Sequence, residues 1–221
     1  HIKSFVKRRG HISRAQERAV EEGMPKWGIA YSAQTHIDFD KQWGTQGQAN
    51  WLEIGFGMGE TTAKIAKAHP HVNYLGVEIY TAGVGSLINK IEEEGIENIR
   101  IISHDVVDVL RDMIPDASLD KVLLYFPDPW RKARHHKRRL IQAEFVSKLA
   151  KKMKPAGVLH CATDWENYAH HMHDVLSVAP DWQNMMPTPF APRPDDRPLT
   201  KFENRGLKLG HGVWDLLYRV R

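Results

Sequence analysis

The sequence predicts an α/β fold in which a mostly parallel sheet is covered by helices on both faces. Short continuous apolar runs, typical of strands buried on both sides, alternate along the chain with segments of helical periodicity. The 221 residues are 42% hydrophobic and 26% charged, as in a globular protein of one full domain with additions. This composition excludes collagen-like, low-complexity and wholly disordered chains.

The elements follow in order from the amino-terminal side. Ser13 and Gln16 form the pattern of a capping box, which predicts a short helix that ends near residue 22. Residues 23–49 lack periodicity and are expected to be irregular. Helices are expected between the later strands, most clearly over 138–153, where an apolar residue recurs every fourth position, and over 165–178 after the fifth strand. The predicted strands are 50–54, 73–78, 99–103, 121–126 and 157–162.

Two further segments complete the chain. Residues 180–198 are rich in proline and are expected to form a long surface loop, and residues 213–220 are expected to form a final strand. We expect a single domain over 1–221, with 1–20 as a basic, flexible N-terminal arm. The longest apolar run, 122–126, is far shorter than the ~18 residues that span a bilayer, so no membrane segment is expected.

The net charge of +4 is distributed unevenly. Residues 1–18 have a local charge of +5 and residues 131–139 one of +6, so the rest of the chain keeps 19 basic and 26 acidic residues, a net of −7. Clustered Lys and Arg side chains are typical of surfaces that bind polyanions such as nucleic acids. The run at 131–139 is the more specific signal, because the charge of 1–18 fits a solvated tail equally well.

A glycine-rich turn follows the first regular strand and contains Gly55, Gly57 and Gly59. Such a turn lets a ligand approach the backbone and the free amides of the next helix. Glu78 ends the second strand, where it can accept hydrogen bonds from both hydroxyls of a ribose, and Asp105 follows the third, where it can meet an adenine edge. Because the carboxyl ends of parallel strands meet in one crevice, these residues predict a nucleoside site.

Glu53, just before the glycines, indicates the kind of nucleoside. A carboxylate there repels a pyrophosphate but favours a ligand that carries an ammonium and a sulfonium group. The G-x-G-x-G spacing also departs from the dinucleotide fingerprint. We therefore expect S-adenosyl-L-methionine rather than NAD.

The fourth strand ends in Phe-Pro-Asp-Pro-Trp at 126–130, directly before the basic run. The two prolines stiffen this loop and hold Asp128 at its tip. A carboxylate at the mouth of the crevice is expected to be functional. Trp130 could either stack on a substrate base or act as a hydrophobic lid, and the sequence favours neither.

With these motifs the chain resembles the bacterial tRNA (guanine-N7-)-methyltransferase family, class I enzymes that methylate guanine in the tRNA variable loop. The resemblance covers essentially the whole chain, although 181–198 matches no motif, and it rests on LEIGFGMG at 52–59, GVEIY at 76–80, FPDPW at 126–130, TDWENY at 163–168 and TKFENRG at 200–206. It implies a Rossmann-like class I methyltransferase fold with a C-terminal antiparallel strand, S-adenosyl-L-methionine as cofactor, S-adenosyl-L-homocysteine as product and tRNA as partner. The expected function is that of a tRNA (guanine(46)-N(7))-methyltransferase.

The resemblance also implies roles for individual residues. In addition to the three glycines, it implies cofactor binding by Glu53, Glu78, Asp105 and Asp128, of which Asp128 is also the catalytic residue. It implies substrate binding by Lys132, Asp164, Thr200, Lys201, Phe202 and Glu203. The family's RNA-interaction segment falls on 134–139, so the expected RNA-binding residues, with Arg131 of the same basic run, are Arg131, Arg134, Lys137, Arg138 and Arg139.

Guanine N7 carries no proton, so its attack on a methyl group needs no general base, and the enzyme's task is mainly placement. We expect Asp128 or Asp164 to accept hydrogen bonds from guanine N1–H and N2–H and thereby direct N7 at the methyl group. The base must leave the tRNA core, at a cost of a few kcal/mol that phosphate contacts of the basic segments would offset.

Three alternatives are weighed against this hypothesis. A nucleic-acid-binding module with a degenerate cofactor site is disfavoured by the complete set of site residues, an NAD-dependent oxidoreductase by Glu53, and a small-molecule methyltransferase leaves the basic run unexplained. We expect no metal, because the histidine pairs lack carboxylate or cysteine partners at ligand spacing, and a buried, unreactive Cys161. A cytoplasmic monomer or homodimer is expected.

Overall fold

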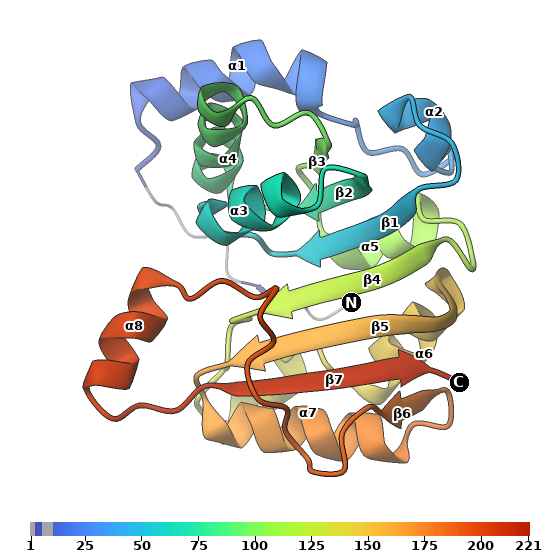
Figure 1. The fold of residues 1–221 in the computed structure, drawn as a ribbon, viewed down its shortest axis with the longest axis vertical. Helices are drawn as coiled ribbons and strands as arrows, with labels where there is room; N and C mark the ends of the chain where they lie inside the picture. Colours follow the sequence, from blue (N-terminus) through green and yellow to red (C-terminus); the bar gives the residue numbers. More distant parts are fainter. Residues whose placement is uncertain (1–2, 6–10) are drawn as a thin grey trace.

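The computed structural model describes residues 3–5 and 11–221, without the side chains of Lys201 and Phe202. Figure 1 shows how its elements are arranged. In chain order they are α1 (Arg14–Trp27), α2 (Phe39–Trp43), β1 (Ala49–Ile54), α3 (Glu60–Ala68), β2 (Val72–Val77), α4 (Thr81–Glu94), β3 (Ile99–Ile102), α5 (Val106–Asp112), β4 (Leu119–Tyr125), the 3₁₀ turn η1 (Ala133–Arg138), α6 (Ala143–Lys152), β5 (Met153–Thr163), α7 (Glu166–Val178), β6 (Trp182–Asn184), α8 (Lys201–Lys208) and β7 (Trp214–Val220).

The strands form one sheet in the order β3-β2-β1-β4-β5-β7-β6. Strands β1 to β5 pair in parallel, while β7 runs antiparallel to both β5 and β6. This confirms the predicted mostly parallel sheet with a C-terminal antiparallel strand. The chain runs outward from β1 to β2 and β3 and then returns to β4 on the other side of β1 (Figure 1). In open α/β sheets, such a switch point is where ligands bind.

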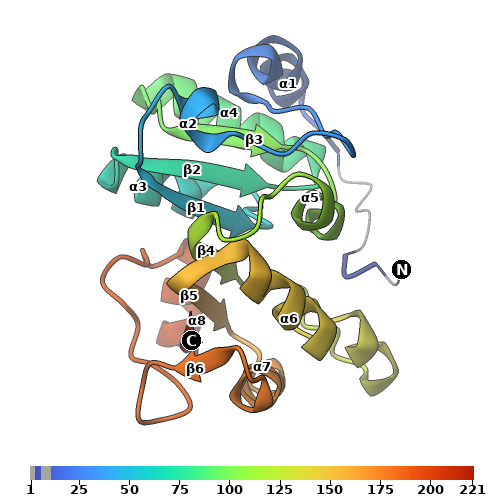
Figure 2. The same cartoon turned by 90° about the vertical axis from the view of Figure 1, so that its right-hand side faces the viewer.

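Helices cover both faces of the sheet, as predicted (Figure 2). One buried cluster joins α1, α3 and α4 to the sheet, through side chains such as Ile65 and Leu87 around Tyr74. The other joins α5, α6 and α7 to the opposite face, through side chains such as Leu149 and Met172. Because alternate strand residues face opposite clusters, the strands are buried on both sides and consist of continuous apolar runs.

The first helix begins where the capping box predicts. The Ser13 hydroxyl accepts a hydrogen bond from the Gln16 amide at 3.2 Å, and the Gln16 side chain accepts one from the Ser13 amide at 3.0 Å. The helix continues to Trp27 rather than ending near residue 22, since Trp27 is buried and donates a hydrogen bond to Glu92 of α4 at 2.6 Å. Residues 14–20 of the predicted arm therefore belong to a packed helix, while residues 1–2 and 6–10 lie outside the described residues.

Two short elements lie where no regular structure was predicted. Helix α2 forms within the segment expected to be irregular, because Asp38 caps it and Phe39 and Trp43 bury their rings. Strand β6 lies within the expected loop 180–198, where the buried Trp182 donates to the carbonyl of Val146 at 2.9 Å. Both elements are too short to produce a periodic pattern, which is why the sequence does not reveal them.

Two further features concern the expectations for a membrane segment and for Cys161. No helix in the described part of the chain combines the length and the apolarity that crossing a membrane requires. Cys161 is fully buried on β5, and this burial raises the pKa of its thiol. A thiol in this state is an inert core residue rather than a nucleophile.

Candidate active site

An open cleft of about 1380 Å³ lies at the carboxyl ends of the parallel strands. The predicted cofactor-binding residues that line it come from four separate segments: Gly55, Gly57, Glu78, Asp105 and Asp128. Residues 3–5 and one side of α1 line the same cleft. The structure therefore brings together side chains that the sequence only suggested were neighbours.

The glycine turn leaves room for a ligand. Gly55, Gly57 and Gly59 all have positive φ angles, of 69°, 57° and 78°, which other residues rarely adopt. A Cβ atom added at Gly55 or Gly57 would meet nothing within 4 Å, so open space lies in front of the backbone there. At Gly59 it would lie 2.8 Å from Leu87, so this glycine instead permits close packing on α4.

Two carboxylates are fixed beside this turn. Glu78 accepts hydrogen bonds from the amides of Gly57, Ile79 and Tyr80 at 2.7 to 2.9 Å, which ties the end of β2 to the glycine turn. Asp105 caps α5 by accepting from the Val107 amide at 3.0 Å, and burial raises the pKa of Asp105. Each carboxylate retains lone pairs that can accept hydrogen bonds from a ligand in the cleft.

Glu53 lies behind the glycine turn rather than in the cleft lining. Its side chain is 3% exposed and accepts a hydrogen bond from the Tyr74 hydroxyl at 2.6 Å. Burial raises the pKa of Glu53 to about 7. The Glu53 side chain therefore faces the interior, where it is held by Tyr74 of β2.

The Asp128 loop, residues 126–130, is held in a strained conformation. Phe126 and Trp130, at its two ends, are non-glycine residues with φ angles of 50° and 48°. Such residues persist only where their surroundings enforce them, and they concentrate at functional sites. The loop is anchored by the Phe126 amide, which donates to the Ala162 carbonyl at 2.8 Å, and by Arg139, which donates to the Pro129 carbonyl at 2.9 Å. Asp128 is thus presented to the cleft by a rigid support.

The basic run lies beside this loop and meets the amino-terminal segment. The Arg138 guanidinium stacks on the Trp130 ring at 3.8 Å and donates to the carbonyls of Lys3 and Phe5. The Trp130 indole donates to the Ser4 carbonyl at 3.0 Å. Arg138 thus covers one face of the Trp130 ring. The cationic side chains exposed on η1 and just before it are Arg131, Lys132, Arg134 and Lys137.

Arg139 differs from the other cations of this run. Its side chain is 2% exposed, lies over the Tyr168 ring and donates to Asn167 at 2.7 Å as well as to Pro129. An RNA phosphate cannot reach a guanidinium so enclosed. We therefore correct the expectation of an RNA contact here, because Arg139 supports the Asp128 loop from within the protein.

The remaining predicted substrate-binding residues lie in two places. Asp164 is exposed directly after β5, next to Trp165, over whose ring Arg131 lies at 4.7 Å. Thr200 and Glu203 form a complete capping box at the start of α8. Lys201 and Phe202 belong to the same helix, but their side chains lie outside the described residues.

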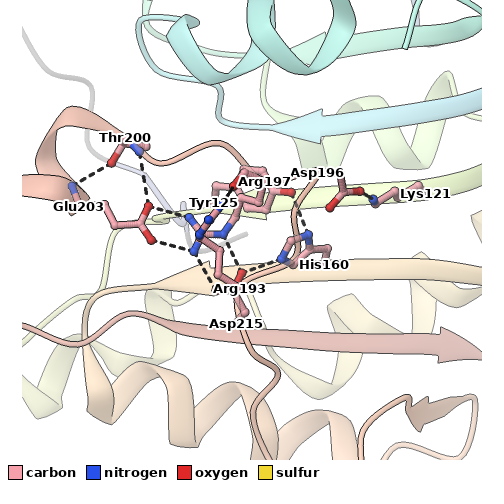
Figure 3. Close-up of polar contacts among 9 residues, drawn as sticks. All are labelled: Lys121, Tyr125, His160, Arg193, Asp196, Arg197, Thr200, Glu203 and Asp215. Carbon is pink, nitrogen blue, oxygen red and sulfur yellow. Dashed lines mark hydrogen bonds and ion pairs between the residues drawn. The ribbon is translucent and has the colours of Figure 1, made fainter. Parts of the chain in front are cut away.

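A buried polar network beneath α8 was not predicted (Figure 3). Arg197 donates two hydrogen bonds to Glu203 and two to Asp215 of β7, at 2.7 to 2.8 Å. Asp215 also contacts His160 of β5 at 2.7 Å, and His160 contacts the Tyr125 hydroxyl at 2.8 Å. Apart from Glu203, which lies in the TKFENRG motif, no sequence signal marks these residues, because they are single polar side chains in separate elements and Arg197 lies in the segment that matched no motif.

The protonation states in this network follow from its geometry. Burial raises the pKa of Tyr125 and lowers that of His160, so the phenol keeps its proton and the imidazole is neutral. Burial opposes ionisation of Asp215, but hydrogen bonds from His160 and Arg197 outweigh it and hold its pKa below the usual range. His160 Nε2–H therefore donates to Asp215, and the Tyr125 hydroxyl donates to Nδ1 of His160.

Two histidines of α7 have structural partners. His171 donates to the Ile141 carbonyl at 2.8 Å, and His173 contacts the Tyr218 hydroxyl at 2.8 Å. Within residues 3–5 and 11–221, no three His, Cys, Asp or Glu side chains are grouped in a way that could hold a metal ion.

Comparisons with known proteins agree with this geometry. Residues 47–216 match the model of a family described as putative methyltransferase. The tRNA (guanine-N(7)-)-methyltransferase of Dechloromonas aromatica is 57% identical over 221 residues, which are 100% of this chain and 89% of that protein. The enzyme of the same name from Bordetella pertussis is 56% identical over 99% of this chain and 85% of its own length. The solved structure of the 16S rRNA methyltransferase KamB has the same fold, with a TM-score of 0.60 at 14% identity over 85% of this chain and 95% of its own.

Proposed function

This chain belongs to the putative methyltransferase family and, within it, to the tRNA (guanine-N(7)-)-methyltransferases, and from that premise we propose how its residues carry out the reaction. The activity is transfer of a methyl group from S-adenosyl-L-methionine to N7 of a guanine in tRNA, with S-adenosyl-L-homocysteine as product. We further propose that the target is the guanine at position 46 in the variable loop and that the enzyme acts in the cytoplasm. The family resemblance of the site motifs supports the first of these, and the tRNA substrate supports the second.

One observation carries the assignment of the site. The rigid loop that presents Asp128 faces the same cleft as the glycine turn, Glu78 and Asp105. Asp128 would therefore lie beside a nucleoside bound in this cleft, and the exposed cations follow Asp128 directly along the chain. This is the arrangement that transfer from a nucleoside cofactor to an RNA base requires.

The residues fit S-adenosyl-L-methionine. The space in front of Gly55 and Gly57 admits a ligand against the backbone, Glu78 can accept hydrogen bonds from the ribose hydroxyls, and Asp105 can accept one from the adenine edge. When bound, the cofactor supplies an electrophilic methyl group. The protein's part is to hold guanine N7 in line with that group, because a correctly oriented pair of reactants reacts much faster than a free pair.

Asp128 lines the cleft and Asp164 is exposed directly after β5, and these are the two carboxylates to which we assign orientation of the guanine. Either can accept hydrogen bonds from N1–H and N2–H on its pairing edge, which leaves N7 free. A fixed carboxylate also stabilises the positive charge that develops on the methylated ring. To Lys132 and the other exposed cations, Arg131, Arg134 and Lys137, we assign the neutralisation of tRNA phosphates, which would offset the cost of extruding the base.

Incubation of an unmodified tRNA transcript with methyl-labelled S-adenosylmethionine, followed by nuclease mapping of the label, tests the proposal. We expect the label on one guanine of the variable loop. The control is a transcript with 7-deazaguanosine at that position, in which a C–H group replaces N7, and it should accept no label. Label on another loop, or undiminished label on the control, would refute the assignment.

A further inference from the structure

In the part of helix α8 whose side chains the structure describes, one buried side chain joins the helix to the body of the protein. Among its described side chains, those of 203–208, Glu203 alone is buried, while Arg205, Leu207 and Lys208 are exposed. Glu203 is also the residue that closes the capping box with Thr200. The group that binds the Glu203 carboxylate therefore contributes to the position of the first turn of α8.

Arg197 binds that carboxylate and fixes its orientation. Nη1 and Nη2 donate to the two Glu203 oxygens at 2.7 and 2.8 Å, while Nε and Nη2 donate to Asp215 at 2.7 and 2.8 Å (Figure 3). The guanidinium is thus held between α8 and β7 and is 1% exposed. A planar fork with four such hydrogen bonds sets the direction of both partners, which a lysine could not do.

The same guanidinium also contacts the base of the Asp128 loop. It lies 5.7 Å from the ring centre of Phe126, the first of the two strained residues. Tyr125, the preceding residue, is linked back to Asp215 through His160. Arg197 therefore contacts the Asp128 loop at Phe126 and the predicted substrate-binding segment 200–203 at Glu203, and it is linked to Tyr125 again through Asp215.

We propose that Arg197 is a positioning residue for methyl transfer, which holds the first turn of α8 and the Asp128 loop in one fixed arrangement at the mouth of the cleft. This inference rests on the proposed function, because it concerns how that site is assembled. Replacing a buried ion pair by apolar residues often leaves stability unchanged or improves it, so the particular contribution of these hydrogen bonds is orientation. Arg197 is absent from the cleft lining, so it acts through these two segments rather than by direct contact with a bound cofactor.

The test compares Arg197→Lys with Lys121→Met. The first keeps the charge but loses the fork. The second breaks the 2.6 Å ion pair between Lys121 and Asp196, which lies one residue away on the same segment, without touching α8. We expect Arg197→Lys to lower kcat for tRNA by about ten- to hundredfold, as small misplacements of reacting groups do, with the Kd for S-adenosylhomocysteine within about twofold of wild type. Lys121→Met should keep kcat within about twofold.

A second variant and a second measurement cover the case in which Arg197→Lys does not fold. Asp215→Asn removes one buried charge and keeps the Arg197–Glu203 pair, and we expect a smaller fall in kcat with unchanged cofactor affinity. Amide hydrogen exchange should become faster over 200–208 in Arg197→Lys or Asp215→Asn but not in Lys121→Met.

These outcomes separate the inference from the function on which it rests. A wild-type protein that does not methylate guanine N7 would refute the proposed function, while the exchange comparison would still test the positioning of α8. Folded Arg197→Lys and Asp215→Asn variants with wild-type kcat and wild-type exchange would overturn the inference. An equal loss of kcat in Lys121→Met would also overturn it. The loss would then follow from loosening the segment that carries Asp196 and Arg197, and not from the loss of the Arg197 hydrogen bonds.

Discussion

The Glu78 carboxylate accepts a hydrogen bond from the Gly57 amide at 2.8 Å, so the acid that ends β2 and the turn that follows β1 form one unit. Glu78→Gln keeps the size of the side chain but places an amide group where these backbone donors converge. Because hydrogen bonds to charged groups contribute about 1.5–3 kcal/mol, we expect affinity for S-adenosylhomocysteine to fall by roughly ten- to hundredfold. Isothermal titration measures this, with Glu93→Gln on the exposed end of α4 as the matched control.

Glu53 predicts an unusual dependence of stability on pH. Its folded-state pKa of about 7 lies above the ordinary 4.5, so the folded state binds more protons than the unfolded state between these values. Stability from this group is therefore greatest at low pH and is lost as pH rises through 7, by about 3 kcal/mol in total. This is the opposite of the usual behaviour of a salt-bridged carboxylate.

Glu53→Gln tests this dependence. The Gln side chain can still accept from Tyr74, and the buried Thr62 hydroxyl also lies within reach of this position. Urea unfolding of both cofactor-free proteins between pH 5 and pH 8 should show that wild type loses stability relative to Glu53→Gln as pH rises. Parallel curves would contradict the buried, proton-binding state of Glu53.

Arg139 and Lys137 should behave differently although they are two residues apart in the basic run. Lys137 is exposed, so Lys137→Gln should reduce the slope of log K for tRNA against log salt concentration by about one and leave kcat nearly unchanged. Arg139 is enclosed and holds the Pro129 carbonyl, so Arg139→Lys should lower kcat with an unchanged salt slope. Fluorescence anisotropy at several salt concentrations and single-turnover kinetics measure the two quantities. A reduced salt slope in Arg139→Lys would restore its role as a phosphate contact.

The sequence predicts local features well and side-chain partnerships poorly. The capping box of Ser13, the strands and the convergence of Gly55, Glu78 and Asp105 all follow from patterns within a few residues or from the rule that parallel strands end at one edge. The burial of Arg139 and the pairing of Arg197 with Glu203 depend instead on which surfaces the fold brings together. A run of cations looks uniform in sequence, so nothing in it distinguishes the one whose side chain is directed inward.

The roles of Asp128 and Asp164 in base recognition can be distinguished by comparing guanosine and inosine transcripts. Inosine lacks the N2 amino group of guanosine but keeps N1–H and N7, so a carboxylate that accepts from both N1–H and N2–H should favour a guanosine transcript over an otherwise identical inosine transcript. The variant Asp128→Asn or Asp164→Asn that removes this carboxylate should lose that preference, because its amide can no longer accept two hydrogen bonds. We expect the preference in kcat/KM to be about tenfold, in keeping with one hydrogen bond to a charged group.

Asp128→Asn should in addition lower kcat with the guanosine transcript by about a hundredfold, since a fixed carboxylate near the reacting ring also stabilises the developing positive charge. Asp164 is exposed and lies outside the strained loop, so Asp164→Asn should have the smaller effect on kcat. Single-turnover rates with saturating cofactor measure the effects of both substitutions. If Asp128→Asn kept a near-normal rate, Asp128 would not be the catalytic residue, and a loss of guanosine preference confined to Asp164→Asn would assign base recognition to Asp164 alone.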